Sequence, residues 1–403
     1  MKHAGPGSVR ASSHAAHQPL VLIGVTHPQT CVILGARLRV FRNAGFRVLL
    51  VSGPGELLDR TARQEGVERV AIPMRREISP IADWVSLVRL WLLLIQRQPD
   101  LVEFSTPKAG LLGTLAAMLC GVPKRIYMLR GLKCETATGL KRLLLLAAER
   151  VAAACAHVVL CNSESLRAEA LALHVAPARK LRLLGQGSSN GVDIHRFIPG
   201  RTKVRARLGI PSNAPVVGFV GRLTCDKGLP ELVAAFEAIL SVEPSAHLLL
   251  VGWFDQAEDV LPDNLRTHIL RHPQIDCTGF VADTAPYYRA MDVLVLPTWR
   301  EGFPNAVLEA AASGVPVVTT ESTGARDSVV PEVTGYLIPP GYPEAIAEFV
   351  LKIIRDRGQA RRMGRAARSW ILRNYPESRV LGLTADYYHS LLESPDVRCA
   401  QSV

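Results

Sequence analysis

Short apolar runs alternate with longer segments of helical spacing along the first half of the chain. Five of these runs have the length and composition of buried strands, at residues 20–25, 46–51, 101–104, 125–129 and 158–161. The segments between them predict four helices, over residues 34–44, 81–97, 109–120 and 140 to about 156. Strands that alternate with helices in this way predict a parallel sheet with helices on both of its faces.

The same alternation restarts in the second half, after a loop rich in Gly, Ser and Asn at residues 185–199. Five further strands are predicted there, at residues 215–220, 246–251, 275–278, 293–296 and 315–319. A chain of 403 residues suits two domains of this kind. We therefore expect a disordered polar tail, two α/β domains and a C-terminal segment, with bounds at residues 1–18, 19–190, 191–377 and 378–403.

Two glutamates follow the strand predicted at 293–296. Glu301 lies on the loop at the carboxyl end of the strand, where open α/β sheets bind their ligands. Glu309 falls about two turns further on, in the helix that begins between them. A carboxylate at a helix start can bind sugar hydroxyls, and the free N–H groups beside it can bind phosphate oxygens. The alternative is a dipole-favoured charge at Glu301 and a solvated helix residue at Glu309.

A glycine turn joins the strand at 215–220 to the next helix and carries two cations, Arg222 and Lys227. The turn permits close approach of a ligand to the backbone, and a helix N-terminus favours an anion. A forked guanidinium and an ammonium can share a diphosphate. Such groups stabilise the charge that builds on a nucleoside diphosphate when its bond to a sugar breaks. Two surface cations near a helix start are the alternative.

These motifs resemble those of a known enzyme family. The pattern Glu-Gly-Phe-Pro-Asn-x-x-x-Glu at 301–309 is preceded by Gly-Phe-Val at 279–281 and followed by Gly-Val-Pro-Val-Val, and it is similar to the retaining glycosyltransferases of family 4. The resemblance extends over about residues 20–388. It implies the α/β GT-B fold, in which two Rossmann-like parallel-sheet domains face each other across a cleft. In that fold a C-terminal helix, here at 378–390, crosses back to the N-terminal domain.

The resemblance also implies roles for single residues. Glu301 is expected to contact the transferred sugar and Glu309 the ribose, while Arg222 and Lys227 hold the diphosphate and complete the catalytic set with Glu301. The other expected donor-binding residues are Gly221, Val281, Gly302, Phe303 and Asn305. Metal-dependent glycosyltransferases often bind Mg²⁺ or Mn²⁺ through a carboxylate pair, and this sequence has no Asp-x-Asp triplet. We therefore expect a reaction without a metal and without a cofactor.

Two features beside the expected nucleotide site are open to more than one interpretation. Trp253 and Phe280 each follow a predicted strand, and each fits either a contact with the nucleotide or a place in the protein core. Asp327 occupies a position where relatives often have Glu. We leave it outside the catalytic set.

The N-terminal half carries the expected acceptor side. The segment Ser-Thr-Pro-Lys-Ala-Gly at 105–110 leads into a helix, so Thr106 and Lys108 can hold a phosphate, although a capped helix start is the alternative. Arg130 ends the next strand where many family members have a His, and we expect it to supply charge. Together with Gly-Ser-Ser-Asn-Gly-Val-Asp at 187–193, these segments resemble a PglA/CapM-like bacterial subgroup. That subgroup transfers a hexose or N-acetylhexosamine from a UDP-sugar to undecaprenyl-diphosphate-linked sugars for capsule, exopolysaccharide or glycoprotein assembly.

The net charge of +11 comes from the first half of the chain. Residues 1–190 contain 25 Lys and Arg against 12 Asp and Glu, a net charge of +13, whereas residues 191–403 contain 22 against 24. An anionic membrane leaflet or a pyrophosphate-linked lipid fits this asymmetry, and a solvated basic surface is the alternative. No nucleic-acid-binding motif accompanies the charge. No run of 18 uncharged apolar residues exists, so we expect peripheral attachment at the cytoplasmic face of the membrane.

Three other functions share parts of this pattern. A nucleotide-sugar 2-epimerase of the same fold is expected to show further acid/base carboxylates around the sugar. A non-catalytic nucleotide-sugar-binding module is expected to lose Arg222, Lys227 or Glu301, and all three are present. A nicotinamide dehydrogenase needs Gly-x-Gly-x-x-Gly at the first turn, where this chain has Gly-Val-Thr-His-Pro. A glycosyltransferase therefore fits the sequence best.

Overall fold

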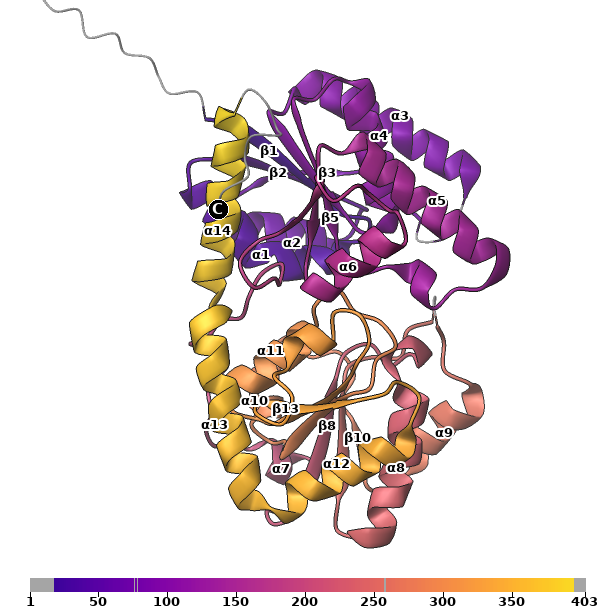
Figure 1. The fold of residues 1–403 in the computed structure, drawn as a ribbon, viewed down its shortest axis with the longest axis vertical. Coiled ribbons are helices and arrows are strands. Elements are labelled where there is room, and N and C mark those ends of the chain that lie inside the picture. The colour runs from indigo at the N-terminus through magenta and orange to yellow at the C-terminus, as the bar shows by residue number, and fades with distance from the viewer. Residues whose placement is uncertain (1–17, 76, 78, 257–258, 395–403) are drawn as a thin grey trace, which may run out of the picture.

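The computed structural model describes residues 18–394, except positions 76, 78, 257 and 258. Figure 1 shows two α/β units, one above the other along the longest axis of the molecule. Nearly all of the tail predicted at 1–18 lies outside the described residues, as does the end of the 378–403 segment.

The first unit is built on a seven-stranded sheet with the order β3-β2-β1-β4-β5-β6-β7, and all neighbouring strands in it are parallel. Its strands are β1 (Leu20–Gly24), β2 (Arg47–Ser52), β3 (Glu68–Ala71), β4 (Leu101–Ser105), β5 (Lys124–Leu129), β6 (Val158–Cys161) and β7 (Leu181–Leu183). Its helices are α1 (Pro28–Asn43), α2 (Glu56–Glu65), α3 (Pro80–Arg97), α4 (Pro107–Leu119), η1 (Lys133–Glu135), α5 (Gly139–Cys155) and α6 (Glu164–Ala172). The five predicted strands are confirmed, and β3 and β7 at the two edges are additional.

The second unit is built on a six-stranded parallel sheet with the order β10-β9-β8-β11-β12-β13. Its strands are β8 (Val216–Val220), β9 (His247–Val251), β10 (Ile275–Cys277), β11 (Val293–Leu296), β12 (Val317–Thr320) and β13 (Gly335–Ile338). The helices from this part of the chain onward are α7 (Val204–Arg207), η2 (Cys225–Lys227), α8 (Leu229–Val242), α9 (Asp263–Arg271), α10 (Ala285–Tyr288), α11 (Asn305–Ala312), η3 (Arg326–Ser328), α12 (Pro343–Arg355), α13 (Arg357–Asn374) and α14 (Glu377–Glu393). The five strands predicted here are also confirmed.

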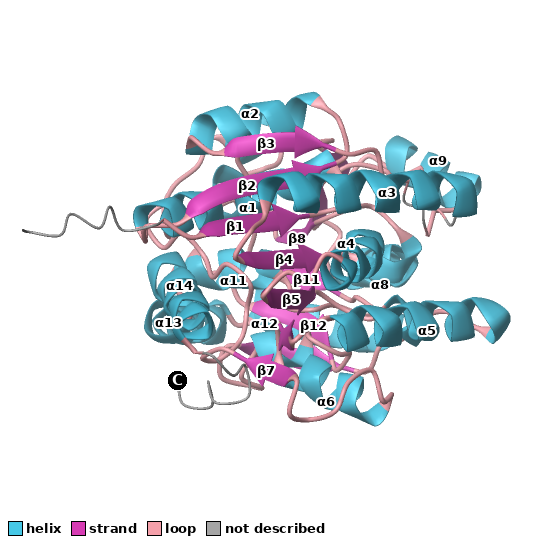
Figure 2. Cartoon of the chain, turned by 90° about the horizontal axis from the view of Figure 1, so that it is seen from above, coloured by secondary structure: helices cyan, strands magenta, loops and turns pink. Residues whose placement is uncertain are grey.

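Helices cover both faces of the first sheet, as the alternation of strands and helices predicted. Along β1, Val21 and Ile23 pack with α1 and α14, whereas Leu20 and Leu22 pack with α3 and α4 on the other face. Successive side chains of a strand point to opposite faces, so one strand contributes to two cores. Figures 1 and 2 show α3, α4 and α5 on one side of this sheet and α14 on the opposite side.

The first helix begins earlier than the sequence pattern predicted. The prediction began at residue 34, whereas α1 begins at Pro28. Proline fits the first turn of a helix because no intrahelical hydrogen bond needs its N–H there. His27 precedes it as the N-cap, and its ring accepts a hydrogen bond from the N–H of Gln29 at 3.3 Å. The residues just after His27, which the sequence pattern left outside the helix, therefore form its capped first turn.

The C-terminal helix crosses back to the first unit, as the family resemblance implied. α13 packs against α11 of the second unit, and α14 then packs against α1 of the first. Tyr388 and Leu391 of α14 lie in the core of the first unit, where the Tyr388 ring contacts Phe41 with centroids 5.0 Å apart. Two Rossmann-like units and this crossing helix confirm the predicted GT-B fold.

Candidate functional site

Loops at the carboxyl ends of both sheets meet between the two units. A Cβ atom at Gly302 would lie 2.4 Å from the carbonyl oxygen of Arg130, so only glycine permits this approach. Gly324, with a φ of +75°, packs in the same way against the carbonyl oxygens of Glu301 and Gly302. Open α/β sheets bind their ligands at the carboxyl ends of strands. The loops after β5, β11 and β12 therefore frame the candidate site.

Side-chain hydrogen bonds also join the two units beside these loops. Arg300 donates from Nε to the hydroxyl of Thr136 at 2.9 Å. Asp327 accepts a hydrogen bond from the N–H of Ser165 at 3.2 Å and a second one from the hydroxyl of Ser165. Asp327, which the sequence left outside the catalytic set, thus links the second unit to the start of α6.

A cavity of about 180 Å³ opens where β8 and β11 end. Its lining residues are Val220, Gly221, Lys227, Leu296, Glu301, Phe303, Pro304, Asn305 and Ala306. The structure therefore brings together five residues that the sequence assigned to the donor site, two of them from the catalytic set. Because α11 begins at Asn305, its first backbone N–H groups, which have no partner within the helix, lie at the wall of this cavity.

Lys227 and Glu301 form an ion pair in this cavity. The Nζ atom of Lys227 lies 2.5 Å from Oε1 of Glu301, and the two side chains are only 14% and 18% exposed. Lys227 ends η2 just after β8, and Glu301 follows β11, which is the neighbour of β8 in the sheet. A sugar diphosphate in the cavity would therefore meet a cation and a carboxylate side by side.

Arg222 lies in the same loop as Lys227 and contacts two aspartates. Its Nη1 donates to Asp255 at 2.9 Å, and its Nη2 lies 3.8 Å from the carboxylate of Asp226. Arg300 also donates to Asp226, at 3.1 Å. Burial acts to raise the pKa of Asp226, but the charge of Lys227, a hydrogen bond from a threonine and the two arginines together lower that pKa below its ordinary value. Asp226 therefore stays ionised and holds the cations around it.

Glu309 lies on α11 but its carboxylate contacts α10. Its Oε2 accepts hydrogen bonds from the hydroxyl of Tyr288 at 2.8 Å and from that of Thr284 at 3.3 Å. Burial raises the pKa of Glu309 to about 7, although both hydrogen bonds act to lower it. Glu309 does not line the cavity that contains Glu301. A ribose held by Glu309 would share its carboxylate with these hydroxyls or displace them.

The remaining residues predicted for the donor side lie in three different surroundings. Phe303 borders the cavity, but its ring is buried and packs on Tyr375 with centroids 5.2 Å apart. Val281 lines another cavity, next to α7 and α10. Trp253 and Phe280 meet edge to face with centroids 5.7 Å apart. Phe280 is 63% exposed, so the interpretation of this residue as a core aromatic is wrong.

The two residues predicted to hold a phosphate before α4 already have partners within the fold. Lys108 pairs with Asp83 of α3 at 2.7 Å, so its charge is balanced. The hydroxyl of Thr106 accepts a hydrogen bond from the N–H of Thr26 at 3.1 Å. The hydroxyl of Thr26 in turn accepts one from the N–H of Ala109 in the first turn of α4, also at 3.1 Å. These contacts join the loop after β1 to the start of α4.

Arg130 has hydrogen-bonding capacity that the described part of the protein does not use. Its Nη1 donates to the hydroxyl of Ser189 at 3.0 Å. Its Nε and Nη2 atoms are buried and meet no hydrogen-bond acceptor among the described residues. Burial and the nearby charge of Arg37 lower the pKa of Arg130 to about 10, so it remains a cation at neutral pH. Buried donors without acceptors are costly, and an anion between the units would satisfy them.

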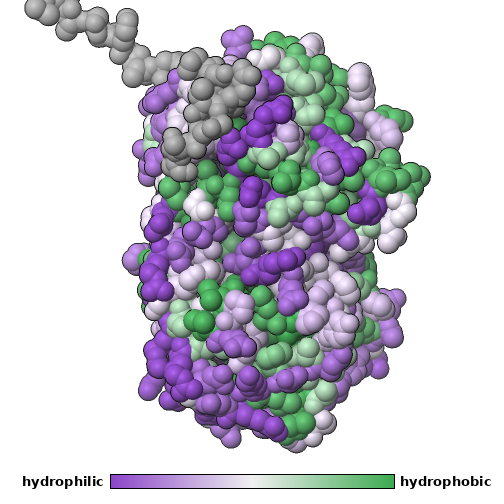
Figure 3. Space-filling model, viewed as in Figure 1, coloured by the Kyte–Doolittle hydropathy of each residue, from purple (hydrophilic) through white to green (hydrophobic). Residues whose placement is uncertain are grey.

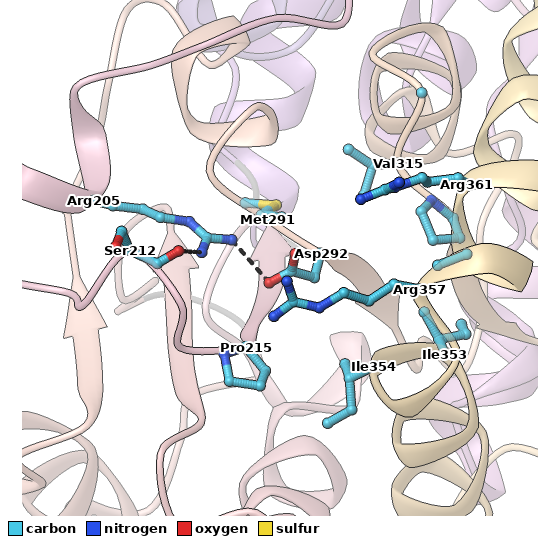
Figure 4. A pocket seen from close by; sticks show the side chains of 13 residues that line it. Arg205, Ser212, Pro215, Met291, Asp292, Val315, Ile353, Ile354, Arg357 and Arg361 are labelled. Carbon is cyan, nitrogen blue, oxygen red and sulfur yellow. Dashed lines mark hydrogen bonds and ion pairs between the residues drawn. The ribbon is translucent and has the colours of Figure 1, made fainter.

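A third cavity, of about 250 Å³, lies at the amino ends of strands of the second sheet (Figure 4). Pro215, Asp292 and Pro316 line it, and each directly precedes a strand of the sheet. In Figure 4 Arg205 points toward Asp292, and the two side chains pair at 2.8 Å. The carboxylate of Asp292 also accepts a hydrogen bond from the N–H of Val216 at 2.8 Å. The ion pair between Arg205 and Asp292 therefore anchors α7 to the sheet. Ligands of such folds bind at the carboxyl ends instead, and we assign this cavity to the packing of the fold.

Two protein families match the sequence, one over each unit. Residues 34–187 match the glycosyl transferase 4-like domain, and residues 214–356 match the glycosyl transferases group 1. The first match includes most of the strands of the first sheet, and the second includes all strands of the second sheet.

Similar proteins match over most of their length. The capsular polysaccharide biosynthesis glycosyltransferase CapM of Staphylococcus aureus is 32% identical over 92% of this chain and 97% of its own. The UDP-Gal:alpha-D-GlcNAc-diphosphoundecaprenol alpha-1,3-galactosyltransferase of Escherichia coli is 29% identical over 83% of this chain and 89% of its own. The crystal structure of Anabaena HepE in complex with UDP-glucose has a TM-score of 0.78 and 20% identity, covering 92% of this chain and 100% of that one. At that identity the structural likeness supports the fold alone.

Proposed function

This chain belongs to family 4 of the glycosyltransferases, and from that premise we propose that it transfers a hexose or N-acetylhexosamine from a UDP-sugar to an undecaprenyl-diphosphate-linked saccharide, with retention of configuration. CapM acts, by its name, in capsular polysaccharide biosynthesis, and the relative from Escherichia coli acts on a sugar linked to diphosphoundecaprenol. The name of the Escherichia coli relative also gives UDP-Gal as its sugar donor. These relatives support a UDP-sugar donor and a lipid-linked acceptor in the assembly of a surface polysaccharide.

The pairing of Lys227 with Glu301 in the cavity is the observation that carries the proposal. When the bond between the sugar and the diphosphate breaks, negative charge builds on the leaving diphosphate. Lys227, Arg222 and the first N–H groups of α11 are suited to stabilise that charge. Glu301 suits the sugar instead, because a carboxylate accepts hydrogen bonds from hydroxyls and repels a phosphate. In this proposal the cations replace a divalent metal, and the reaction needs no cofactor.

The acceptor diphosphate is proposed to contact Arg130, whose Nε and Nη2 atoms have no acceptor among the described residues. Lys108 and Thr106 have partners in Asp83 and Thr26, so we assign them a part in shaping the loop before α4. The net charge of +13 over the first 190 residues supports peripheral attachment to the anionic cytoplasmic leaflet. The protein would thus work at the membrane surface, where a lipid-linked acceptor lies.

A transfer assay with purified protein tests the proposed function. The protein is incubated with a panel of radiolabelled UDP-sugars and undecaprenyl-diphosphate-linked sugars, and the label that enters the lipid is measured. We expect one donor to label the lipid, with an α linkage in the product when an α-linked donor is used. Glu301→Gln should abolish transfer, whereas Glu348→Gln on the exposed surface of α12 should leave it unchanged.

Three results would contradict the proposal. A full rate of transfer in the Glu301→Gln variant would remove this residue from the site. Conversion of the UDP-sugar into its 2-epimer without any acceptor would identify an epimerase. Tight binding of a UDP-sugar with no turnover by any donor and acceptor pair would indicate a binding module.

A further inference from the structure

Two helices of the first unit present apolar residues to the outside. On α3 the exposed apolar residues are Ile81, Trp84, Val85, Trp91, Leu92 and Ile95. On α5 they are Leu140, Leu143, Leu144 and Val151. α4 lies between the two helices and packs against both. Figure 3 shows hydrophobic side chains gathered at the upper right of the molecule, over the region where Figure 1 places α3 to α5. We call these residues of α3 and α5 the outer apolar face.

The outer apolar face is not needed to attach α3 to its sheet. Leu90, Leu93 and Leu94 already bury one side of the helix in the core. A surface helix normally has one apolar side, and its opposite side is polar. Trp84 and Trp91 lie about two turns apart on the outward side, and Trp84 is 67% exposed. Indole rings prefer the boundary between water and lipid, because one part of the ring is apolar and the other donates a hydrogen bond.

Exposed cations border the outer apolar face. Arg89 lies on α3, and Lys141, Arg142 and Arg150 lie on α5. Helices that lie in the plane of a membrane interface combine Lys and Arg with Trp and Leu in this way. A second copy of this chain seated on the same face would bring these like charges opposite one another, which disfavours a dimer. An anionic leaflet complements both the cations and the apolar residues.

The outer apolar face begins beside the candidate site. Asp83 in the first turn of α3 pairs with Lys108 at the start of α4, which follows the carboxyl end of β4. Thr136, just before α5, accepts a hydrogen bond from Arg300 of the second unit. The first turns of α3 and α5 therefore lie at the end of the first unit that faces the second unit. No helix among the described residues is long and apolar enough to cross a membrane.

We propose that the outer apolar face of α3 and α5 inserts into the interface of an anionic membrane leaflet while the flanking cations contact lipid headgroups. This inference rests on the proposed function, because insertion at this end of the unit holds the candidate site next to a lipid-linked acceptor. Attraction between charges alone is screened by salt, whereas burial of apolar side chains is not. Binding to anionic vesicles should therefore fall with salt to a residual level set by insertion.

Sedimentation with vesicles tests the proposal. Vesicles of phosphatidylcholine, with or without phosphatidylglycerol, are mixed at low and high salt with three proteins: the wild type, the double variant Trp84→Glu/Leu143→Glu, and Leu270→Glu. Leu270 is a matched control, since it is an exposed leucine on α9 of the second unit, 57% exposed. At high salt the double variant should bind anionic vesicles about tenfold or more weakly than the wild type, and the control should bind like the wild type.

Two further measurements separate this inference from other outcomes. All three proteins should transfer sugar equally well to a water-soluble acceptor, and a wild type inactive in that assay would contradict the proposed function rather than the docking. Brominated acyl chains should quench tryptophan emission, because Trp84 and Trp91 are two of five tryptophans. Equal vesicle binding by the double variant and the wild type at high salt would overturn the proposal. So would a wild-type dimer that the double variant converts to a monomer.

Discussion

A buried charged cluster connects the crossing helix α14 to the first unit, and its disruption should strongly destabilise the protein. Arg37 of α1 and Glu103 of β4 pair with side chains that are 0% exposed. The hydroxyl of Tyr388 on α14 donates to the same oxygen of Glu103 and accepts from Nη2 of Arg37 at 3.0 Å. One tyrosine of the last helix therefore completes an ion pair inside the N-terminal core.

The expected magnitude follows from the burial of the cluster. Glu103→Gln keeps the shape of the side chain but leaves the guanidinium of Arg37 in the core without an opposite charge. Breaking one side of a buried pair costs about 3–5 kcal/mol in the free energy of unfolding. Tyr388→Phe removes only the hydroxyl and keeps the ring on Phe41. Loss of its hydrogen bonds to charged groups should cost about 1.5–3 kcal/mol.

Urea unfolding near neutral pH, followed by far-UV circular dichroism, measures both losses. The control is Glu68→Gln, because Glu68 pairs on the surface with Arg47 and Arg97, and all three side chains are at least 40% exposed. Each such pair contributes at most about 1 kcal/mol. If Glu103→Gln lowers the free energy of unfolding no more than Glu68→Gln does, the assignment of the buried cluster as an anchor for α14 is wrong.

Three predictions concern the candidate site. Lys227→Ala and Arg222→Ala should each lower kcat/KM by a factor that corresponds to about 2–4 kcal/mol of lost transition-state stabilisation, as for loss of one oxyanion donor. The control Arg365→Ala, on the exposed side of α13, should change kcat/KM little. Equal losses in all three variants would point to a general charge effect. Transfer should persist in excess EDTA, and an enzyme that stops on chelation and recovers with Mn²⁺ would refute the metal-free site. UDP should bind more tightly as the pH rises from about 6 to about 8, because the pKa of Glu309 is about 7 and ribose hydroxyls would favour its ionised form. Calorimetry should find that this dependence is reduced in Glu309→Gln, and an unchanged dependence would count against the ribose contact.

The sequence placed Lys227 and Glu301 in one candidate site because of where strands end. Lys227 and Glu301 are far apart in the chain, but each follows an apolar run that forms a strand, and both strands are parallel. The carboxyl ends of parallel strands lie side by side at the same end of the sheet. β8 and β11 are also neighbours in the strand order, which brings the two side chains to 2.5 Å. Short apolar runs and loop residues were therefore sufficient for this part of the site.

Elements without an apolar run were not predicted. β3 reads Glu-Arg-Val-Ala and is mostly exposed because it lies at the edge of its sheet, so its composition resembles that of a loop. On α3 the apolar spacing predicted a helix correctly but did not show that one apolar side faces outward. Periodicity gives the faces of a helix, whereas the position of neighbouring elements decides which face is buried.

Side-chain pairing was the least predictable part of the site. Arg300 and Asp226 belong to the charge network around Arg222, yet the sequence offered no reason to select them. The carboxylate of Glu309 bonds to Tyr288, and that contact depends on how α10 packs against α11. Spacing along the chain locates a residue on an element but does not determine which distant side chain it meets.

The pairing of charges in the candidate site bears on how the proposed donor would bind. Lys227 pairs with Glu301 and Arg222 with Asp255, so each cation of the predicted catalytic set has a carboxylate partner. A largely buried cation without an opposite charge would be costly, and these carboxylates therefore hold the cations in place. A diphosphate that binds Lys227 takes over its charge and leaves Glu301 free to accept hydrogen bonds from the sugar. The diphosphate is the leaving group of the proposed reaction, and its binding to Lys227 is also what releases the carboxylate of Glu301. Donor binding and the placement of Glu301 beside the sugar are therefore one event.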